Sequence, residues 1–258
     1  MRKIADDLGA LCQLPDGPVT RVVSLVPSLT EAIALTRPEA LLGATDWCTH
    51  PGDLDVTRVR GTKNPDLAAI IALKPQLVIA NKEENRELDV QRLREAGVTV
   101  WVTLIEDVLE ALAAMERLFE VALQWGIPPW LGSVMRLWSR RSPAPVATVV
   151  VPIWRDPWMV IGSRNFTTDL LAHVGLANAL AGHPDRYPKV DVADLDRADV
   201  SAVLLPDEPY VFTAEDGPEA FSTAPTRRVS GRLLTWYGPS LIEAREVLDT
   251  LAEDLRAR

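Results

Sequence analysis

The sequence predicts an α/β protein with two Rossmann-like lobes, each with a mostly parallel sheet, joined by a single long backbone helix. Short apolar, β-branched runs alternate with helix-like segments along the whole chain. Runs such as Leu77–Ala80 are continuously apolar, which is typical of strands covered by helices on both faces of a parallel sheet. A proline-rich break, RRSPAP at 140–145, precedes a second series of this kind. We therefore expect lobes at 1–127 and 144–258 and a connecting helix at 128–143.

The first lobe is expected to open with a buried strand at Val22–Val26, which Pro27 ends. Ser28 and Glu31 have the S-x-x-E spacing of a capping box, which predicts a helix over Leu29–Leu35. A short strand is expected at Leu41–Ala44.

Asn64, Pro65 and Asp66 combine a capping residue, a proline at the first helical position and an acid in the first turn. They predict a helix that runs to about Leu73. The remaining elements expected in this lobe are a strand at Leu77–Ala80, a helix at Glu87–Ala96 closed by Gly97, and a strand at Val98–Val102.

Apolar residues recur at helical spacing over Glu106–Trp125, which predicts one helix there. A second helix is expected over Trp130–Arg140 after the prolines at 128 and 129. The second lobe is expected to contain an apolar run at Thr148–Ile153, segments at Thr168–Val174 and Val203–Leu205, and a final helix from about Ser240 to Leu255.

Composition limits the class of partner. The chain has 258 residues, is 47% hydrophobic and carries a net charge of −9, so a nucleic-acid backbone is not an expected partner. Two cysteines do not form a disulfide framework. No apolar run follows the basic N-terminal residues as in a signal peptide, and none reaches the roughly 20 residues of a membrane span. We expect a cytoplasmic protein, or an extracytoplasmic one if the chain is a trimmed piece with an added Met.

Three segments give the chain a family resemblance: RVVSLVPSLTE at 21–31, ALKPQLVIA at 72–80 and PWMVIGSRNFTTDLLAHVGLANAL at 157–180. In order and spacing the chain resembles the helical-backbone substrate-binding proteins that deliver cobalamin, haem and iron–siderophores to ABC importers. The resemblance implies two lobes with a small-molecule ligand in the cleft between them. The expected ligand is a corrinoid, haem or ferric chelate.

In transport members of that family, a surface glutamate on each lobe docks onto arginines of the membrane permease. The corresponding positions here are Ala68 and Ala193, with Asp194 adjacent to the second. An alanine cannot make a charge-assisted contact with arginine. Docking on an ABC permease is therefore doubtful.

Ligand-contacting residues are expected in the loops that follow the strands, where parallel α/β sheets bind ligands. The resemblance places Trp47, Trp158 and Trp236 at cleft-facing aromatic positions. Aromatic, charged and amide side chains elsewhere in these loops suit a large planar or carboxylated ligand. The additional candidates are Lys63, Asn64, Glu83, Glu84, Arg86, Trp154, Arg164, Tyr210 and Tyr237.

Cys48 and His50 have a C-x-H spacing that invites a metal interpretation, because side chains two apart in an extended loop face the same way. A zinc site needs three or four ligands, whereas axial ligation of a haem or corrin needs one. The alternative for Trp47 is packing between loops, and one tryptophan of 154 and 158 is expected in a hairpin core. Trp101, Trp125, Trp130 and Trp138 are assigned to packing.

The sequence contains no P-loop, nucleophile elbow or dinucleotide-binding fingerprint, so we do not expect an enzyme. The main hypothesis is a non-catalytic binding protein for a corrinoid, haem or metal chelate, not coupled to an importer. The alternatives are a conventional importer component for cobalamin or ferric siderophores, and an enzyme dependent on Cys48, His50 or Glu84.

Overall fold

The computed structural model describes residues 1–139 and 142–257, and the chain divides into two compact α/β units. Unit 1 comprises Met1–Ile105, Leu109–Val134 and Tyr237–Pro239, and unit 2 comprises Glu106–Val108, Met135–Trp236 and Ser240–Arg258. The polypeptide crosses from unit 1 into unit 2 inside the helix α5 (Pro129–Trp138). The expected end of this helix at Arg140 and the start of the RRSPAP break lie outside the described residues.

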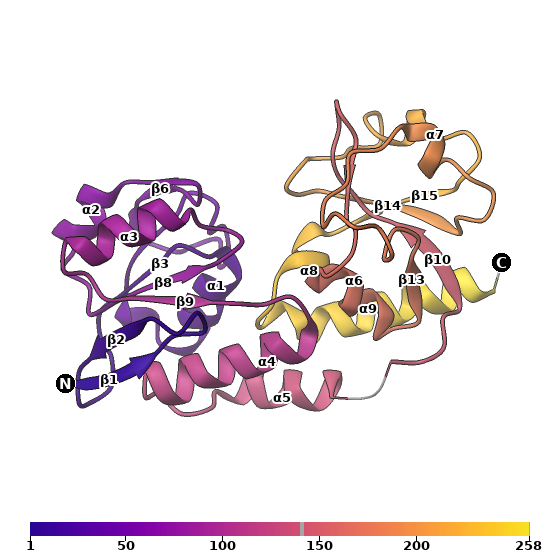
Figure 1. The fold of residues 1–258 in the computed structure, drawn as a ribbon. Coiled ribbons are helices and arrows are strands. Elements are labelled where there is room, and N and C mark those ends of the chain that lie inside the picture. The colour runs from indigo at the N-terminus through magenta and orange to yellow at the C-terminus, as the bar shows by residue number, and fades with distance from the viewer. Residues whose placement is uncertain (140–141, 258) are drawn as a thin grey trace. The chain divides into compact units, whose positions relative to one another are not determined.

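Unit 1 is built on a five-stranded parallel sheet in the order β5-β4-β3-β8-β9. Figure 1 labels three of these strands, β3, β8 and β9. Its strands are β3 (Val22–Ser24), β4 (Leu41–Ala44), β5 (Thr57–Arg58), β8 (Leu77–Asn81) and β9 (Val100–Thr103). Its helices are α1 (Pro27–Thr36), α2 (Leu67–Ala72), α3 (Glu87–Glu95) and most of α4 (Val108–Glu116), with a 3₁₀ turn at Pro38–Ala40. The parallel sheet is confirmed, as are the strands expected at 41–44 and 77–80. The strands expected at 22–26 and 98–102 are present with different bounds, Val22–Ser24 and Val100–Thr103.

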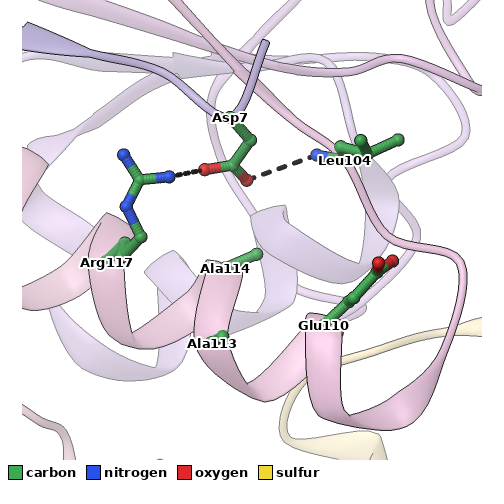
Figure 2. Close-up of a pocket in the computed structure, with 6 residues that line it drawn as sticks. All are labelled: Asp7, Leu104, Glu110, Ala113, Ala114 and Arg117. Atoms are coloured by element: carbon green, nitrogen blue, oxygen red, sulfur yellow. Dashed lines mark hydrogen bonds and ion pairs between the residues drawn. The ribbon is translucent and has the colours of Figure 1, made fainter. Parts of the chain in front are cut away.

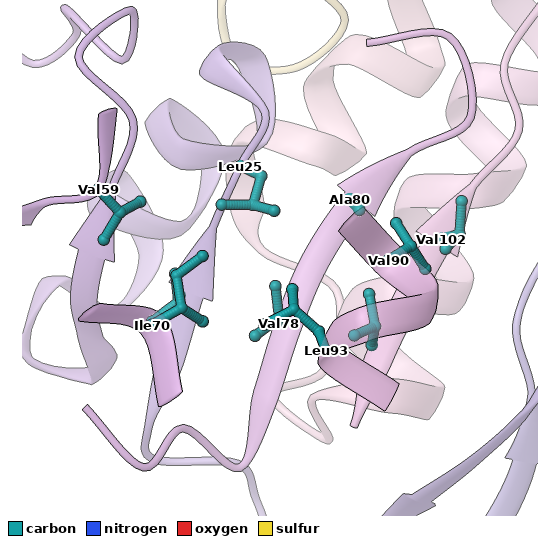
Figure 3. Packing of buried hydrophobic residues seen from close by; sticks show 10 residues of the cluster. Leu25, Val59, Ile70, Val78, Ala80, Val90, Leu93 and Val102 are labelled. Atoms are coloured by element: carbon teal, nitrogen blue, oxygen red, sulfur yellow. The ribbon is translucent and has the colours of Figure 1, made fainter. Parts of the chain in front are cut away.

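The core of unit 1 lies between the sheet and the pair α2 and α3 (Figure 3). Val78 and Ala80 of β8 face this core together with Ile70 from α2 and Leu93 from α3. The intervening residues of β8 are also fully buried, because successive side chains point to opposite faces of a strand. The sheet is therefore covered on both faces, as the continuous apolar runs predict.

A hairpin of β1 (Arg2–Ala5) and β2 (Leu11–Leu14) is held against the end of the sheet by a buried carboxylate. Asp6 Oδ2 accepts from Arg94 at 2.7 Å and from the Val102 amide at 3.2 Å. Its other oxygen accepts from the amides of Leu8 and Ala10. Sequence reasoning missed this hairpin because its strands show no apolar run.

Unit 2 contains a four-stranded parallel sheet in the order β13-β10-β14-β15. These strands are β13 (Leu176–Asn178), β10 (Ala147–Val150), β14 (Ala202–Pro206) and β15 (Thr226–Val229), and an antiparallel hairpin, β11 (Pro152–Trp154) with β12 (Met159–Val160), follows β10. The helices are α6 (Phe166–Ala172), α7 (Val192–Leu195), α8 (Gly231–Thr235) and α9 (Ser240–Arg256), with a 3₁₀ turn at Pro218–Ala220. Within this unit α6, α8 and α9 pack together beside β10 and β13 (Figure 1).

Two predicted helix starts are wrong. Helix α1 begins at Pro27 with Val26 as its N-cap and no side-chain cap, so Ser28 and Glu31 lie inside the helix rather than in a capping box. Proline suits the first helical position, where its missing amide is not needed. Asn64 and Pro65 form the short strand β7, paired with β6 (Arg60–Gly61), and Asp66 caps α2 by accepting from the Ala69 amide at 3.0 Å.

The helix expected over Glu106–Trp125 is not a continuous α-helix. It begins at Val108, and after Glu116 the chain continues as a π-helical segment over Arg117–Ala122.

Within the described residues no helix has both the length and the apolar character that crossing a bilayer requires.

The core of unit 1 offers a matched pair of leucines on α3. Replacing the fully buried Leu93 by alanine is expected to lower the free energy of unfolding by about 2–5 kcal/mol, because it removes apolar contacts and leaves a cavity. Leu88→Ala on the same helix, where the side chain is 52% exposed, should change it by less than about 0.5 kcal/mol. Urea unfolding followed by circular dichroism measures both, and equal effects would contradict the packing described.

Candidate functional site

The loops that follow the strands of unit 1 open on one edge of its sheet, because all five strands are parallel. Trp47 follows β4 and is 62% exposed. Its indole nitrogen lies close to Gly61, where a Cβ would approach to 3.4 Å. Lys63 reaches the loop after β8 and donates to the Glu83 carbonyl oxygen at 2.5 Å. The structure thus brings several predicted side chains to one edge of this unit: Trp47, Lys63, Asn64, Glu83 and Glu84.

Two asparagines that sequence reasoning did not select determine the shape of the loop after β8. Asn81 accepts from the amides of Glu83 at 2.8 Å and Glu84 at 3.2 Å, and it donates to the Thr103 hydroxyl. Asn85 accepts from the Asn81 amide and donates to the carbonyl oxygens of Leu25 and Thr62. Both asparagines are buried, so these bonds satisfy groups that would otherwise be costly to bury. The N-x-x-x-N spacing at a strand end is the signal that could have identified them.

Glu84 is bonded to a tyrosine from a distant part of the sequence. The hydroxyl of Tyr237 donates to Glu84 Oε1 at 2.8 Å, and the Tyr237 side chain is only 5% exposed. Burial, and then the charge of Glu84, raise the pKa of Tyr237 well above its ordinary value. The next residue, Gly238, has φ +151 and lies so close to α1 that a Cβ would sit 3.2 Å from the Ser28 carbonyl oxygen. Tyr237 therefore holds the loop of Glu84, and its expected contact with a ligand stays a prediction.

Two other candidates are engaged in the structure. Arg86 is the N-cap residue of α3 and donates to Asp89 at 2.7 Å. Trp236, in unit 2, is 6% exposed, with the Arg232 guanidinium 6.0 Å from its ring centroid. A ligand role for these side chains stays a prediction.

Cys48 and His50 do not face the same way. The Cys48 thiol is fully buried and bonded to the hydroxyls of Thr30 at 3.0 Å and Thr45 at 3.1 Å. His50 is exposed, and its Nδ1 lies 3.1 Å from the Thr49 hydroxyl. The two side chains therefore do not point at a common position where one ion could bind both. Among residues 1–139 and 142–257, no three side chains of His, Cys, Asp or Glu gather so that they could hold a metal ion.

Three of the predicted aromatic residues of unit 2, Trp154, Trp158 and Tyr210, belong to one cluster. Trp154 is 46% exposed and packs edge-on against Tyr210, with ring centroids 5.5 Å apart. Trp158 is partly buried against the apolar core of this unit and stacks on Phe212. Tyr210 donates to Asp216 at 2.6 Å, and this bond lowers the pKa of the Asp216 carboxyl and raises that of the phenol.

Arg164 is exposed and has φ +45 at the turn before α6. The buried Asn165 caps that helix by accepting from the Thr167 amide at 2.9 Å, and it donates to the Tyr187 hydroxyl. Arg164 thus lies directly before a capped helix, the position that the sequence predicted for it.

Unit 1 also contains a small hollow of about 200 Å³ (Figure 2). Asp7 lies in it between Arg117, with which it forms an ion pair, and the Leu104 amide, from which it accepts at 3.3 Å. Burial raises the pKa of Asp7, although these two partners oppose the shift. None of its lining residues was predicted as a site residue: Asp7, Leu104, Glu110, Ala113, Ala114 and Arg117.

The tryptophans assigned to packing are enclosed in their units. Trp101 and Trp138 are fully buried, and Trp138 donates to the Leu241 carbonyl oxygen at 2.8 Å. Trp130 donates to the Thr36 hydroxyl, and Trp125 to the Val19 carbonyl oxygen. The two alanines at the permease-docking positions, Ala68 on α2 and Ala193 on α7, are both exposed.

No family model matches the chain, but known proteins are similar to it over more than two thirds of its length. A vitamin B12-binding protein of Vibrio vulnificus is 23% identical over 190 residues, which cover 69% of this chain and 68% of that protein. An uncharacterized ABC transporter substrate-binding lipoprotein of Bacillus subtilis is 25% identical over 246 residues, 88% of this chain and 78% of that protein.

Solved structures show the same fold. A periplasmic vitamin B12 binding protein of Vibrio cholerae superposes with a TM-score of 0.73 at 17% identity, covering 93% of this chain and 99% of that chain. A periplasmic haem-binding protein in complex with two haems superposes with a TM-score of 0.76 at 23% identity, covering 92% and 98%. The resemblance and the fold class predicted from the sequence are confirmed. A cytoplasmic location gains no support, because these proteins are named as periplasmic or as a lipoprotein.

Burial of both thiols predicts low reactivity. Burial raises the pKa of Cys12 from 9.0 to about 11 and raises that of Cys48, so less thiolate forms at a given pH. At pH 8 the folded protein should react with Ellman's reagent about 100-fold more slowly than the urea-unfolded chain. Rapid reaction of one thiol before unfolding would contradict the burial described here.

Removal of the Tyr237 hydroxyl should loosen unit 1. Tyr237→Phe is expected to lower the free energy of unfolding by about 1–3 kcal/mol, because a partly buried hydrogen bond to a carboxylate is lost. Urea unfolding with an unchanged m-value measures the effect. A change smaller than about 0.5 kcal/mol would show that the Glu84 contact contributes little.

Proposed function

We propose that this chain is a non-catalytic ligand-binding protein of the helical-backbone type, which binds a corrinoid, haem or other metal chelate at the loops that follow its parallel strands. Trp47 is the observation that carries the proposal. It is a large aromatic side chain, 62% exposed, at the edge where parallel α/β sheets bind ligands. The broad face of a tryptophan at this edge suits contact with the face of a flat conjugated ligand.

The surroundings of Trp47 support this role. Lys63 and the carboxylate loop at 83–84 lie at the same edge, and the loop is held in one shape by Asn81, Asn85 and Tyr237. A preformed site loses less entropy when the ligand binds. The names of the relatives and structural neighbours, which are binding proteins for vitamin B12 or haem, agree with this class of ligand.

We further propose that the protein acts outside the cytoplasm without docking on an ABC permease through the usual pair of glutamates. Ala68 and Ala193 stand exposed at those two positions and offer no charge to an arginine. The second candidate function is a conventional importer component, which the lipoprotein relative favours because it is named as part of an ABC transporter. The two functions share the ligand and differ in the partner.

A titration tests the ligand. Hydroxocobalamin, haemin and a ferric hydroxamate chelate are added separately to the purified protein, and absorbance and tryptophan fluorescence are recorded. At least one should bind saturably, and Trp47→Ala should weaken its Kd about tenfold or more because an aromatic contact is lost. Absence of saturable binding with all three would refute the proposal.

Leu35→Ala is the matched control for this titration. Leu35 is an exposed apolar residue at 61%, near the end of α1, which runs away from the edge that carries Trp47. Its replacement should leave the Kd unchanged. An equal loss in both variants would indicate a general loss of structure instead of a lost ligand contact.

A further inference from the structure

The loop that carries Trp47 joins two parallel strands without a helix. It spans residues 45–56, between β4 and β5, and contains no helix or strand of its own. Parallel strands are usually connected through a helix, whose internal hydrogen bonds order the connection. This loop has no such support, so contacts from outside it must hold its shape. We call residues 45–56 the Trp47 loop.

Arg58, the last residue of β5, reaches back into the Trp47 loop. Its Nη1 atom donates to the carbonyl oxygens of Thr45 at 3.0 Å and Cys48 at 2.9 Å. Its Nη2 atom donates to the Leu54 carbonyl oxygen at 3.3 Å. A guanidinium holds its donors in a rigid planar fork, so it fixes the positions of the three oxygens relative to one another. Arg58 thereby ties the beginning of the loop to its end.

The Cys48 side chain fastens the same loop from inside unit 1. Cys48 is fully buried, whereas the residues on either side of it are exposed. Its thiol lies 3.0 Å from the hydroxyl of Thr30 on α1 and 3.1 Å from that of Thr45. Cys48 is therefore held at two atoms, because Arg58 binds its carbonyl oxygen and the two hydroxyls bind its sulfur.

These contacts determine where Trp47 lies. Trp47 directly precedes Cys48, and its side chain is 62% exposed, so its position depends more on the backbone than on packing around the ring. The Asp46 amide donates to the Arg60 carbonyl oxygen at 2.8 Å. The Thr49 amide donates to the Trp47 carbonyl oxygen at 3.0 Å. The backbone is thus bonded on both sides of the tryptophan.

We infer that Arg58, together with the buried thiol of Cys48, positions Trp47 for the ligand contact proposed above, so that the Trp47 loop has its binding shape before a ligand arrives. This inference rests on the proposed function. A loop that is already ordered loses less conformational entropy on binding, and the ligand is therefore bound more tightly. Neither residue needs to touch the ligand for this effect.

Arg58 is exposed, so a direct charge contact between its guanidinium and a ligand is the alternative role. The two roles differ in what a lysine at this position would do. Lysine keeps the positive charge but carries it on one nitrogen, which cannot bridge three carbonyl oxygens in a planar fork. A positioning role is therefore lost in Arg58→Lys, whereas a charge role is kept.

Matched variants test the positioning role. Hydroxocobalamin, haemin and a ferric hydroxamate chelate are titrated separately into each purified variant. For a chelate that binds, Arg58→Ala and Arg58→Lys should each weaken the Kd about fivefold, and Cys48→Ala about threefold. Cys48→Ser, whose hydroxyl keeps the bonds to Thr30 and Thr45, should restore most of the affinity. Arg92→Ala, on the exposed face of α3, is the control and should leave the Kd unchanged.

A double-variant cycle shows whether Arg58 acts through Trp47. If it does, Arg58→Ala should change the Kd by less than about twofold once Trp47 has been replaced by alanine, because no ring is then left to position. A residue that only supports the fold would lower the affinity by the same factor in both backgrounds. Urea midpoints verify that each variant is folded.

Hydrogen exchange measures the order of the loop without any ligand. The amides of Cys48, Thr49 and Leu54 are bonded within the loop, and in Arg58→Ala they should exchange about tenfold faster. The amides of the buried strand β8 should exchange at the rate of the unmodified protein, because Arg58 does not contact that strand through any of its bonds.

The outcomes separate this inference from the proposed function. If the unmodified protein binds none of the three chelates, both fail. If a chelate binds and Arg58→Lys retains full affinity, or Arg58→Ala acts equally with and without Trp47, the positioning role is overturned and the proposed function stands. Unchanged exchange of the loop amides in Arg58→Ala would overturn the positioning role as well.

Discussion

The parallel pairing of the strands is the constraint on which the rest of each unit depends. In a parallel sheet every strand ends at the same edge, so the loops that follow the strands gather there whatever their sequence. Both faces of the sheet must then be covered, and the complete burial of β8 shows that they are in unit 1. Polar and aromatic residues that have no place on either face are confined to the edge, and this is where Trp47 and Trp154 lie.

Polar side chains that accept several hydrogen bonds determine the shape of the loops at several points. Asp6 accepts four hydrogen bonds and holds the β1–β2 hairpin, and Asn81 with Asn85 shapes the loop after β8. Asp196 accepts from three successive amides at 222–224 and from the Ser222 hydroxyl, which depresses the pKa of its carboxyl. Such a carboxylate stabilises the fold above its ordinary pKa, and the contribution is lost as the pH falls towards the depressed value.

The sequence predicted the overall class and the strands β3, β4, β8, β9, β10 and β14, because a continuous apolar run indicates a strand that is buried on both faces. It did not predict β1, β2, β5, β13 or β15, which lack such runs. It predicted helix starts less well. A serine three residues before a glutamate is compatible with a capping box, but Pro27 can begin the helix one residue earlier and makes the cap unnecessary. Asn64 was a plausible cap, yet a hairpin with Arg60 and Gly61 engages the backbone there. A local sequence pattern can allow two different helix starts, and it does not show which of them tertiary packing selects.

The candidate site was predicted only in part. Sequence reasoning identified the exposed Trp47 and Trp154, because strand-end position follows from the order of the elements. It could not tell that Tyr237 is enclosed against Glu84, since these residues are 153 positions apart and nothing local encodes their contact. Likewise, two tryptophans four residues apart look equivalent in the sequence, and only the ring contacts with Phe212 and Phe221 distinguish the packed one from the exposed one.

The burial of both thiols has a practical consequence for optical work on this protein. Cys12 and Cys48 are the two cysteines of the chain, and both are buried within unit 1. A cysteine introduced at an exposed position near the strand ends would therefore be labelled selectively by a maleimide dye, without first removing the native residues. Because neither native thiol competes for the dye, the folded chain is suited to conversion into a fluorescent reporter.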